Sequence, residues 1–228
     1  MPFIHEDFLP FNHTARPVTR VVYLHGFASG PQSGKARFFG RKLTECGVPV
    51  EIPQLDGGDF ERLTVTGQLA VIDQAVGGRP AVLMGSSLGG YLAALYASRH
   101  AEIERLVLLA PAFQFPRRFR ERYAPEELER WKRQGSAPLY HYGYQDERLL
   151  GYQFLEDAAR YEDEPDFQQP ALLLHGAADA VVPAAISRDF AARHPNVALH
   201  LLESGHELTD VLEPMWALVR PFLEAGRA

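Results

Sequence analysis

The sequence predicts an α/β domain with a mostly parallel central sheet, helices on both faces of the sheet, and an inserted cap. Three observations support this prediction: short continuous apolar runs of strand length, stretches with helical spacing between them, and one aromatic-rich stretch that breaks the alternation. Strands that alternate with helices pair in parallel, because a parallel connection needs a crossover. Parallel strands buried on both faces are apolar without interruption, as these runs are.

The composition limits the class of protein. A chain of 228 residues is long enough for one large domain. Its formal net charge of −6 argues against nucleic acid or an anionic membrane as a partner, so we expect a small-molecule substrate. The single cysteine, Cys46, excludes an intrachain disulfide. The chain has no apolar run of membrane-spanning length, and its first residues lack the features of a secretory signal. We therefore expect a cytoplasmic protein.

The expected elements follow in order along the chain. Residues 1–17 are expected to form an N-terminal arm. The expected strands are 18–24, 48–52, 80–84, 106–110, 170–175 and 197–202. The expected helices are 33–46, 61–76, 90–100, 183–193 and 213–224. Together these elements form a core made of residues 18–111 and 169–228.

Residues 112–168 break the alternation of strands and helices, and we interpret them as an inserted cap. Nearly half of the chain's 14 Phe, 9 Tyr and 2 Trp residues fall in this stretch. That much apolar surface needs something to cover, which favours a cap over a long surface loop. A helix is expected to begin at Pro125, and a hairpin is expected from residues 139–144 and 149–154.

Gly85-Ser86-Ser87-Leu88-Gly89 has the G-x-S-x-G pattern of a nucleophile elbow, a tight turn between a strand and a helix. Such a turn holds its serine in a strained backbone conformation and pushes the hydroxyl out of the sheet. Here an apolar run precedes the motif, and a helix that begins with small residues follows it. This context makes Ser87 a candidate nucleophile.

A serine hydroxyl needs a base to take its proton, and the base needs an acid to orient it. In elbow enzymes the chain order is Ser, then Asp or Glu, then His. His206 follows the last expected strand, at the carboxyl end where catalytic groups of open α/β sheets lie, so it is the candidate base. Asp179 follows the preceding strand and is the candidate acid. The competing carboxylates Glu203 and Asp210 are too near His206 in sequence to occupy a separate loop.

A developing oxyanion needs preorganised donors, which in elbow enzymes are two backbone amides. One is the amide after the nucleophile, here Leu88. The other lies in the loop after an earlier strand, where Phe27 is the first candidate and Ala28 the second. The aromatic residues expected to line the substrate pocket are Phe113, Trp131, Tyr142 and Phe154.

Two other motifs are incomplete in this sequence. A phosphate-binding loop at Lys35 fails, because Ser29 stands where its first glycine should be and Ala36 where Ser or Thr should bind magnesium. Lys35 is instead expected to be a structural or surface residue near a helix start. A zinc-protease motif at His206 fails, because residue 210 is Asp. We therefore expect no metal and no cofactor.

With this Ser-Asp-His order, residues 18–225 resemble the α/β-hydrolase superfamily. The run V-V-Y-L-H-G-F-A-S-G-P-Q-S-G-K-A at 21–36, with I-P-Q-L at 52–55 and G-S-S-L-G-G-Y at 85–91, is similar to the bacterial YqiA/YcfP-like hydrolases. The cap and the H-G-x-x-D-x-x-V-P segment at 175–183 also resemble acyl-protein thioesterase and acyl-glucuronide esterase relatives. The resemblance implies hydrolysis of an ester or thioester without metal or cofactor, with Ser87, Asp179 and His206 as the triad.

The predicted function is therefore that of a serine hydrolase that cleaves a carboxylic ester or thioester through an acyl-enzyme. A C–C bond hydrolase would use the same triad. A non-catalytic binding protein of the same fold is the alternative of a different class, although a binder has no need of all three residues. Acyl chain length, leaving group and oligomeric state remain open, because fold does not fix substrate.

Overall fold

The computed structural model describes residues 18–225, so the expected arm at 1–17 lies outside the described residues. Within them, six strands form one parallel sheet in the order β2-β1-β3-β4-β7-β8. These strands are β1 (Val21–Leu24), β2 (Val50–Glu51), β3 (Ala81–Ser86), β4 (Ile103–Leu109), β7 (Ala171–Gly176) and β8 (Val197–Leu202). The predicted fold class, an α/β fold with a mostly parallel central sheet, is confirmed.

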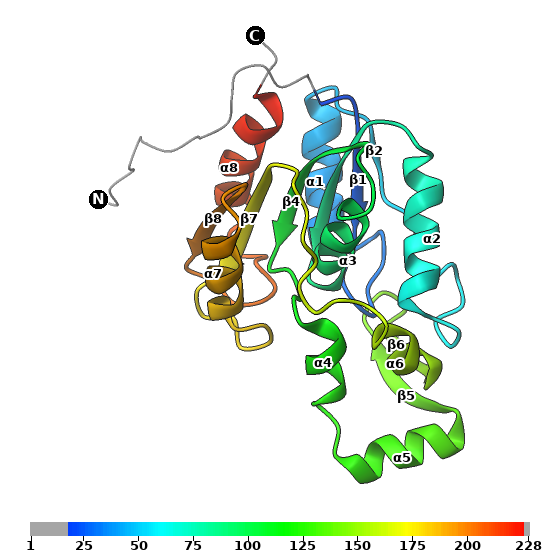
Figure 1. The fold of residues 1–228 in the computed structure, drawn as a ribbon. Helices are drawn as coiled ribbons and strands as arrows, with labels where there is room; N and C mark the ends of the chain where they lie inside the picture. Colours follow the sequence, from blue (N-terminus) through cyan, green and yellow to red (C-terminus); the bar gives the residue numbers. More distant parts are fainter. Residues whose placement is uncertain (1–17, 226–228) are drawn as a thin grey trace.

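Helices cover both faces of this sheet (Figure 1). On one face lie α1 (Gly34–Glu45) and α8 (Leu212–Glu224). On the other lie α2 (Val65–Val76), α3 (Leu88–Ala97) and α7 (Ala184–Arg193). Alternate residues of the central strands face the two cores, so Leu83 packs with α3 while Met84 packs with α1 and α8. Two apolar faces explain why these strands are apolar without interruption.

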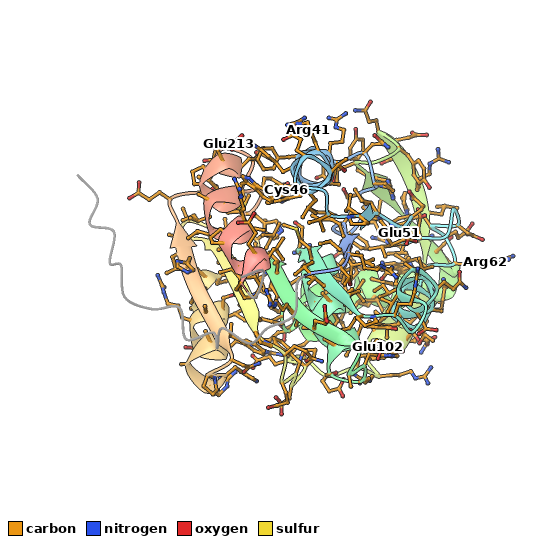
Figure 2. All side chains as sticks on the ribbon, turned by 90° about the horizontal axis from the view of Figure 1, so that it is seen from above. Arg41, Cys46, Glu51, Arg62, Glu102 and Glu213 are labelled. Carbon is orange, nitrogen blue, oxygen red and sulfur yellow. The ribbon has the colours of Figure 1, made fainter. Side chains whose placement is uncertain are left out.

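The view from above shows the same layers (Figure 2). Helices α1 and α8 lie side by side, and Lys42 of α1 pairs with Glu213 of α8 at 2.9 Å. Arg41 points outward from this layer, whereas Arg62 and Glu102 lie at the rim of the opposite side. These labelled charged groups lie at the periphery, while mainly apolar side chains fill the space between helices and sheet.

The stretch expected to be a cap forms three helices and a hairpin between β4 and β7, which Figure 1 shows below the sheet. Its elements are α4 (Phe115–Arg120), α5 (Pro125–Gln134), β5 (Ser136–His141), β6 (Asp146–Gly151) and α6 (Gln153–Ala158). Strands β5 and β6 pair antiparallel as a separate two-stranded sheet. The helix expected at Pro125 begins there.

The hairpin differs from the prediction in its boundaries. Strand β5 begins at Ser136 and β6 at Asp146, so each strand begins three residues earlier than expected. In this register Leu139 pairs with Arg148. Gln145 adopts a left-handed φ of 55° in the turn at 142–145. The ladder ends at Gly151, whose amide donates to Glu61 O at 2.9 Å instead of to the partner strand. The next residues then enter α6 rather than extending the strand.

The five helices expected in the core also begin one to four residues away from their expected starts. The helix expected at 61–76 begins at Val65, because the Thr64 hydroxyl accepts a hydrogen bond from the Gly67 amide at 2.9 Å and caps the helix there. Pro183 is the residue before α7 rather than its first residue. Among residues 18–225, the helices all fall short of the length and apolar character that crossing a bilayer would require.

Candidate active site

Ser87 lies at the turn between β3 and α3 with φ 53° and ψ −117°, a backbone conformation that is strained for any residue with a side chain. The neighbouring glycines make this turn possible. A Cβ on Gly85 would lie 2.2 Å from Gly89 O, and a Cβ on Gly89 would lie 2.1 Å from Leu24 O. Only glycine fits at either position, which explains the G-x-S-x-G spacing physically.

His206 approaches Ser87 from the loop after β8. Its Nε2 lies 2.9 Å from Ser87 Oγ. The loop is held on both sides of the histidine. The Ser204 hydroxyl donates to the Asp210 carboxylate, and Lys35 Nζ donates to Glu207 O at 2.6 Å. The imidazole is therefore presented by an anchored loop rather than by a free one.

Asp179 lies in the loop after β7 and completes the chain of contacts. Its Oδ2 lies 2.7 Å from His206 Nδ1, and its Oδ1 accepts hydrogen bonds from the Val181 and Val182 amides, both at 2.8 Å. Its side chain is inaccessible to solvent. Of the competing carboxylates, Asp210 accepts from Ser204 instead.

The charge state of Asp179 follows from its surroundings. Burial alone would raise its pKa, but hydrogen bonds from His175, His206 and the Val182 amide outweigh burial and hold the pKa well below its ordinary value. An ionised carboxylate only accepts hydrogen bonds, so His206 Nδ1 carries the proton. His206 Nε2 then carries a lone pair that accepts a hydrogen bond from the Ser87 hydroxyl, which is the state that a general base needs.

The two amides expected to bind an oxyanion have no competing partner. Among the described residues, neither the Phe27 amide nor the Leu88 amide donates a hydrogen bond to a protein acceptor. Leu88 opens α3, and the first amides of a helix point outward unpaired. The loop that carries Phe27 lies beside the nucleophile, since a Cβ on Gly26 would lie 3.6 Å from Ser87 Cβ.

The four residues expected to line the substrate pocket do not gather in one place. Phe154 stacks on Phe27 with ring centroids 5.5 Å apart, next to the oxyanion loop. Phe113 stacks on Phe190, and Tyr142 packs against Tyr140. Trp131 packs against Tyr123 and Tyr152, and Tyr123 in turn contacts Phe119. Tyr142 is also 72% exposed. Of the four, Phe154 is the one in ring contact with Phe27.

Around Phe27, a cluster of aromatic rings joins the oxyanion loop to the cap. The ring centroids lie 5.1–6.3 Å from that of Phe27, and the rings come from Phe60, Phe115, Phe119 and Phe154. Phe115 and Phe119 are not among the pocket residues predicted from the sequence, although their spacing of four places them on one face of a helix. We call these five residues the Phe27 cluster.

The residues set aside in the sequence have structural surroundings. Lys35 is buried and anchors the His206 loop, as described above. Arg118 of α4 donates to Val181 O at 2.8 Å, and so connects α4 to the Asp179 loop. Among residues 18–225, His, Cys, Asp and Glu side chains form no group of three or more that could hold a metal ion.

Three solved structures have a similar fold over most of their length. Est1E from Butyrivibrio proteoclasticus, solved with ferulic acid bound, is 22% identical with a TM-score of 0.79, over 94% of this chain and 91% of that chain. Alpha/beta hydrolase domain-containing protein 10 from mouse is 20% identical with a TM-score of 0.75, over 90% and 89%. Paleococcus ferrophilus monoacylglycerol lipase is 19% identical with a TM-score of 0.72, over 92% and 96%.

No curated protein sequence matches the chain. A family model does match, however, and it covers residues 20–223, which include every strand of the sheet and all three residues of the Ser-His-Asp chain. Its description is Uncharacterised protein family (UPF0227). The chain therefore belongs to UPF0227, and it shares its fold with the three solved structures above.

Proposed function

We propose that this protein is a serine hydrolase that cleaves carboxylic esters or thioesters through an acyl-enzyme. The observation that supports the proposal is the continuous contact from Ser87 Oγ through His206 to Asp179, at 2.9 Å and 2.7 Å. Nucleophile, base and orienting acid lie within hydrogen-bond distance in the required order. A binding protein of the same fold would not need this arrangement.

The reaction follows from the proton positions. Ser87 Oγ attacks the carbonyl carbon while His206 Nε2 takes its proton, and the carbonyl oxygen becomes an oxyanion that the Phe27 and Leu88 amides can bind. Asp179 stabilises the imidazolium and remains ionised. The carbon–oxygen or carbon–sulfur bond then breaks, and His206 returns the proton to the leaving group. Water repeats the sequence on the acyl-enzyme, releases the carboxylic acid and regenerates Ser87.

The Phe27 cluster supports an apolar acyl or aryl group on the substrate. Phe27 is partly exposed beside the elbow, and the rings behind it offer apolar and edge-to-face contacts. Ferulic acid, an aromatic acid, is bound to the similar protein Est1E. We therefore include aryl carboxylic esters beside short aliphatic esters and thioesters among the substrates to be tested.

The test is hydrolysis of p-nitrophenyl acetate and butyrate by Ser87→Ala. We expect kcat/KM to fall by at least about 1,000-fold, since removal of the nucleophile abolishes the covalent path. Ser98→Ala, at the end of the same helix, is the matched control and should keep wild-type activity. Activity of Ser87→Ala within about threefold of wild type would overturn the proposal.

Two further measurements separate the alternatives. Labelling of Ser87 by a fluorophosphonate is expected for an activated serine and is not expected for a binding protein. A panel of ester, thioester and β-diketone substrates separates an esterase or thioesterase from a C–C bond hydrolase. Labelling at Ser87 with cleavage of the diketone alone would replace ester hydrolysis with C–C bond hydrolysis.

A further inference from the structure

We infer that His175, a second buried histidine, is a positioning residue that holds Asp179 for the triad. The inference rests on the proposed function, because it concerns the same triad. The sequence offers His175 only as a residue at a strand end. The structure places its ring against the carboxylate oxygen that His206 uses.

The surroundings of His175 define a site with three contacts. The side chain lies in β7 and has no solvent exposure. Its Nε2 lies 2.9 Å from Val182 O and 3.1 Å from Asp179 Oδ2. Its Nδ1 lies 2.8 Å from Ser187 Oγ on α7. The ring thus connects the strand, the Asp179 loop and the following helix.

Chemistry assigns the proton on this ring. A carbonyl oxygen and an ionised carboxylate only accept hydrogen bonds, so Nε2 between Val182 and Asp179 must carry a hydrogen. The Ser187 hydroxyl can then donate to Nδ1, which leaves the imidazole neutral with every polar atom paired. Ser187 is itself fully buried, so this hydroxyl has a fixed partner rather than water. The ring is thus held in one orientation, with its Nε2–H facing Val182 O and Asp179 Oδ2.

The consequence is a carboxylate with four nitrogen atoms close to its two oxygens. Asp179 Oδ1 accepts from the Val181 and Val182 amides, and Oδ2 accepts from His206 and lies 3.1 Å from His175 Nε2. Because both oxygens have partners, the carboxylate cannot rotate about the Cβ–Cγ bond of Asp179 without losing some of them. Because the same ring also contacts Val182 O, His175 fixes the loop at its far end as well as at the acid.

His175 therefore affects both the geometry and the protonation of the triad. Its N–H stabilises the ionised form of Asp179 and lies near the imidazolium that forms on His206. Without this N–H, the ionised form of Asp179 loses stabilisation and its pKa rises toward the ordinary value. The more basic carboxylate attracts the Nδ1 proton of His206 more strongly, which moves the acid limb of the pH–rate profile to higher pH.

Three other charged groups face this cluster. Lys35 comes from α1, Glu207 follows His206 in its loop, and Arg118 comes from α4. They are retained in every variant proposed below. A shift between variants is therefore assigned to the histidine position itself.

The experiment compares two amide variants of His175. In His175→Gln the side-chain nitrogen can reach the place of Nε2, whereas in His175→Asn it can reach only the place of Nδ1. Both side chains are neutral amides, so the cost of burying an amide at this position is similar in the two variants. Rates are divided by the concentration of sites that a fluorophosphonate labels, so a partly folded preparation still gives a valid kcat.

We expect His175→Asn to lose about tenfold or more in kcat with little change in KM. We also expect its acid limb to move up by about half a pH unit or more. His175→Gln should recover most of both properties. Should neither variant fold, Ser187→Ala keeps the ring but removes its Nδ1 partner, and it should lower kcat by about threefold or more with the same KM.

Wild-type kcat and pH profile in His175→Asn, or equal impairment of the Asn and Gln variants, would overturn the inference. If the fallback variant is the one measured, unchanged kcat in Ser187→Ala would overturn it. A wild-type protein that neither hydrolyses esters nor labels at Ser87 would instead overturn the proposed function. The two failures are therefore distinguishable.

Discussion

At the scale of the residue, close neighbours determine the conformation of Ser87, the ionisation of Asp179 and the tautomer of His206. Ser87 keeps a positive φ because Gly85 and Gly89 leave room for the turn. Asp179 stays ionised because donated hydrogen bonds outweigh its burial. His206 lies between them with one nitrogen committed to each partner. The tautomer of this one ring is therefore set by what Asp179 can accept.

Asp179→Asn tests this dependence. Its carbonyl oxygen would take the place of Oδ1, which accepts from two amides, so its NH2 would face His206 Nδ1. His206 would then hold its proton on Nε2, where it cannot accept from Ser87. We expect kcat to fall by about 10,000-fold at neutral pH.

The measurement is ester hydrolysis, with Asp189→Asn as the control on the exposed side of α7. This control should keep wild-type activity. A loss of less than about tenfold in Asp179→Asn would assign the role of the acid to another carboxylate.

At the scale of the element, the β5–β6 hairpin contacts the loop that carries Phe27. The Gly143 amide donates to Ala28 O at 3.3 Å, and Ala28 itself has a φ of 49°. Beside this contact the Tyr144 hydroxyl donates to Asp56 Oδ2 at 3.0 Å, which ties the hairpin turn to the loop after β2. The turn thus lies against the backbone next to Phe27.

Gly143→Val tests whether this contact positions the oxyanion amides. A Cβ on Gly143 would lie 3.0 Å from both Ser29 C and His141 Cε1, so the hairpin and the loop would have to separate. Displacement of the Phe27 amide is expected to lower kcat by about 10- to 100-fold while KM changes less.

The control is Gly34→Ala at the start of α1, where an added Cβ meets nothing within 4 Å. Steady-state hydrolysis and thermal unfolding are measured for both variants. A valine variant with wild-type kcat would mean that the hairpin turn has no part in positioning the loop.

The order of the strands assembles the site at the scale of the whole molecule. Phe27 follows β1, Ser87 follows β3, Asp179 follows β7 and His206 follows β8. Because the strands are parallel and closely ordered in one sheet, their carboxyl ends bring these residues to one edge. The two apolar cores on either side of the sheet keep the strands in register.

Several histidines couple the stability of this molecule to pH. Burial lowers the pKa of His25, His141 and His200 below the ordinary value of 6.5. The unfolded chain therefore binds these protons at a higher pH than the folded protein does. The stability that the neutral rings contribute is lost as pH falls below about 6.5. Asp179, whose pKa is lowered, adds a further loss below its unfolded value of 3.8.

Urea unfolding at pH 8, 7, 6 and 5 measures this coupling. We expect the unfolding midpoint to be nearly constant above pH 7 and to fall between about pH 7 and 5. His200→Gln should reduce the slope of that fall, because it removes one of the three groups. A midpoint that rises toward pH 5 would contradict the assignment of neutral buried rings.

The sequence by itself determined the α/β fold class, the strand and helix order, and the family. These features depend on apolar runs and on motifs such as G-x-S-x-G, in which the physical requirement is local: a turn that only glycine permits, and strands apolar on both faces. The resemblance to YqiA/YcfP-like hydrolases rests on the same local strings and is confirmed by the match to UPF0227.

The tertiary structure alone decided which side chains meet. The triad contacts join residues up to 119 positions apart, and no periodicity predicts their distances. Of the expected pocket residues, Phe154 contacts Phe27, whereas Phe113 packs on Phe190 of α7 and Tyr142 is exposed. The second imidazole on Asp179 depends on the path of the loop between His175 and Val182. Hydrogen-bond partners follow from that path, which the residue types alone leave open.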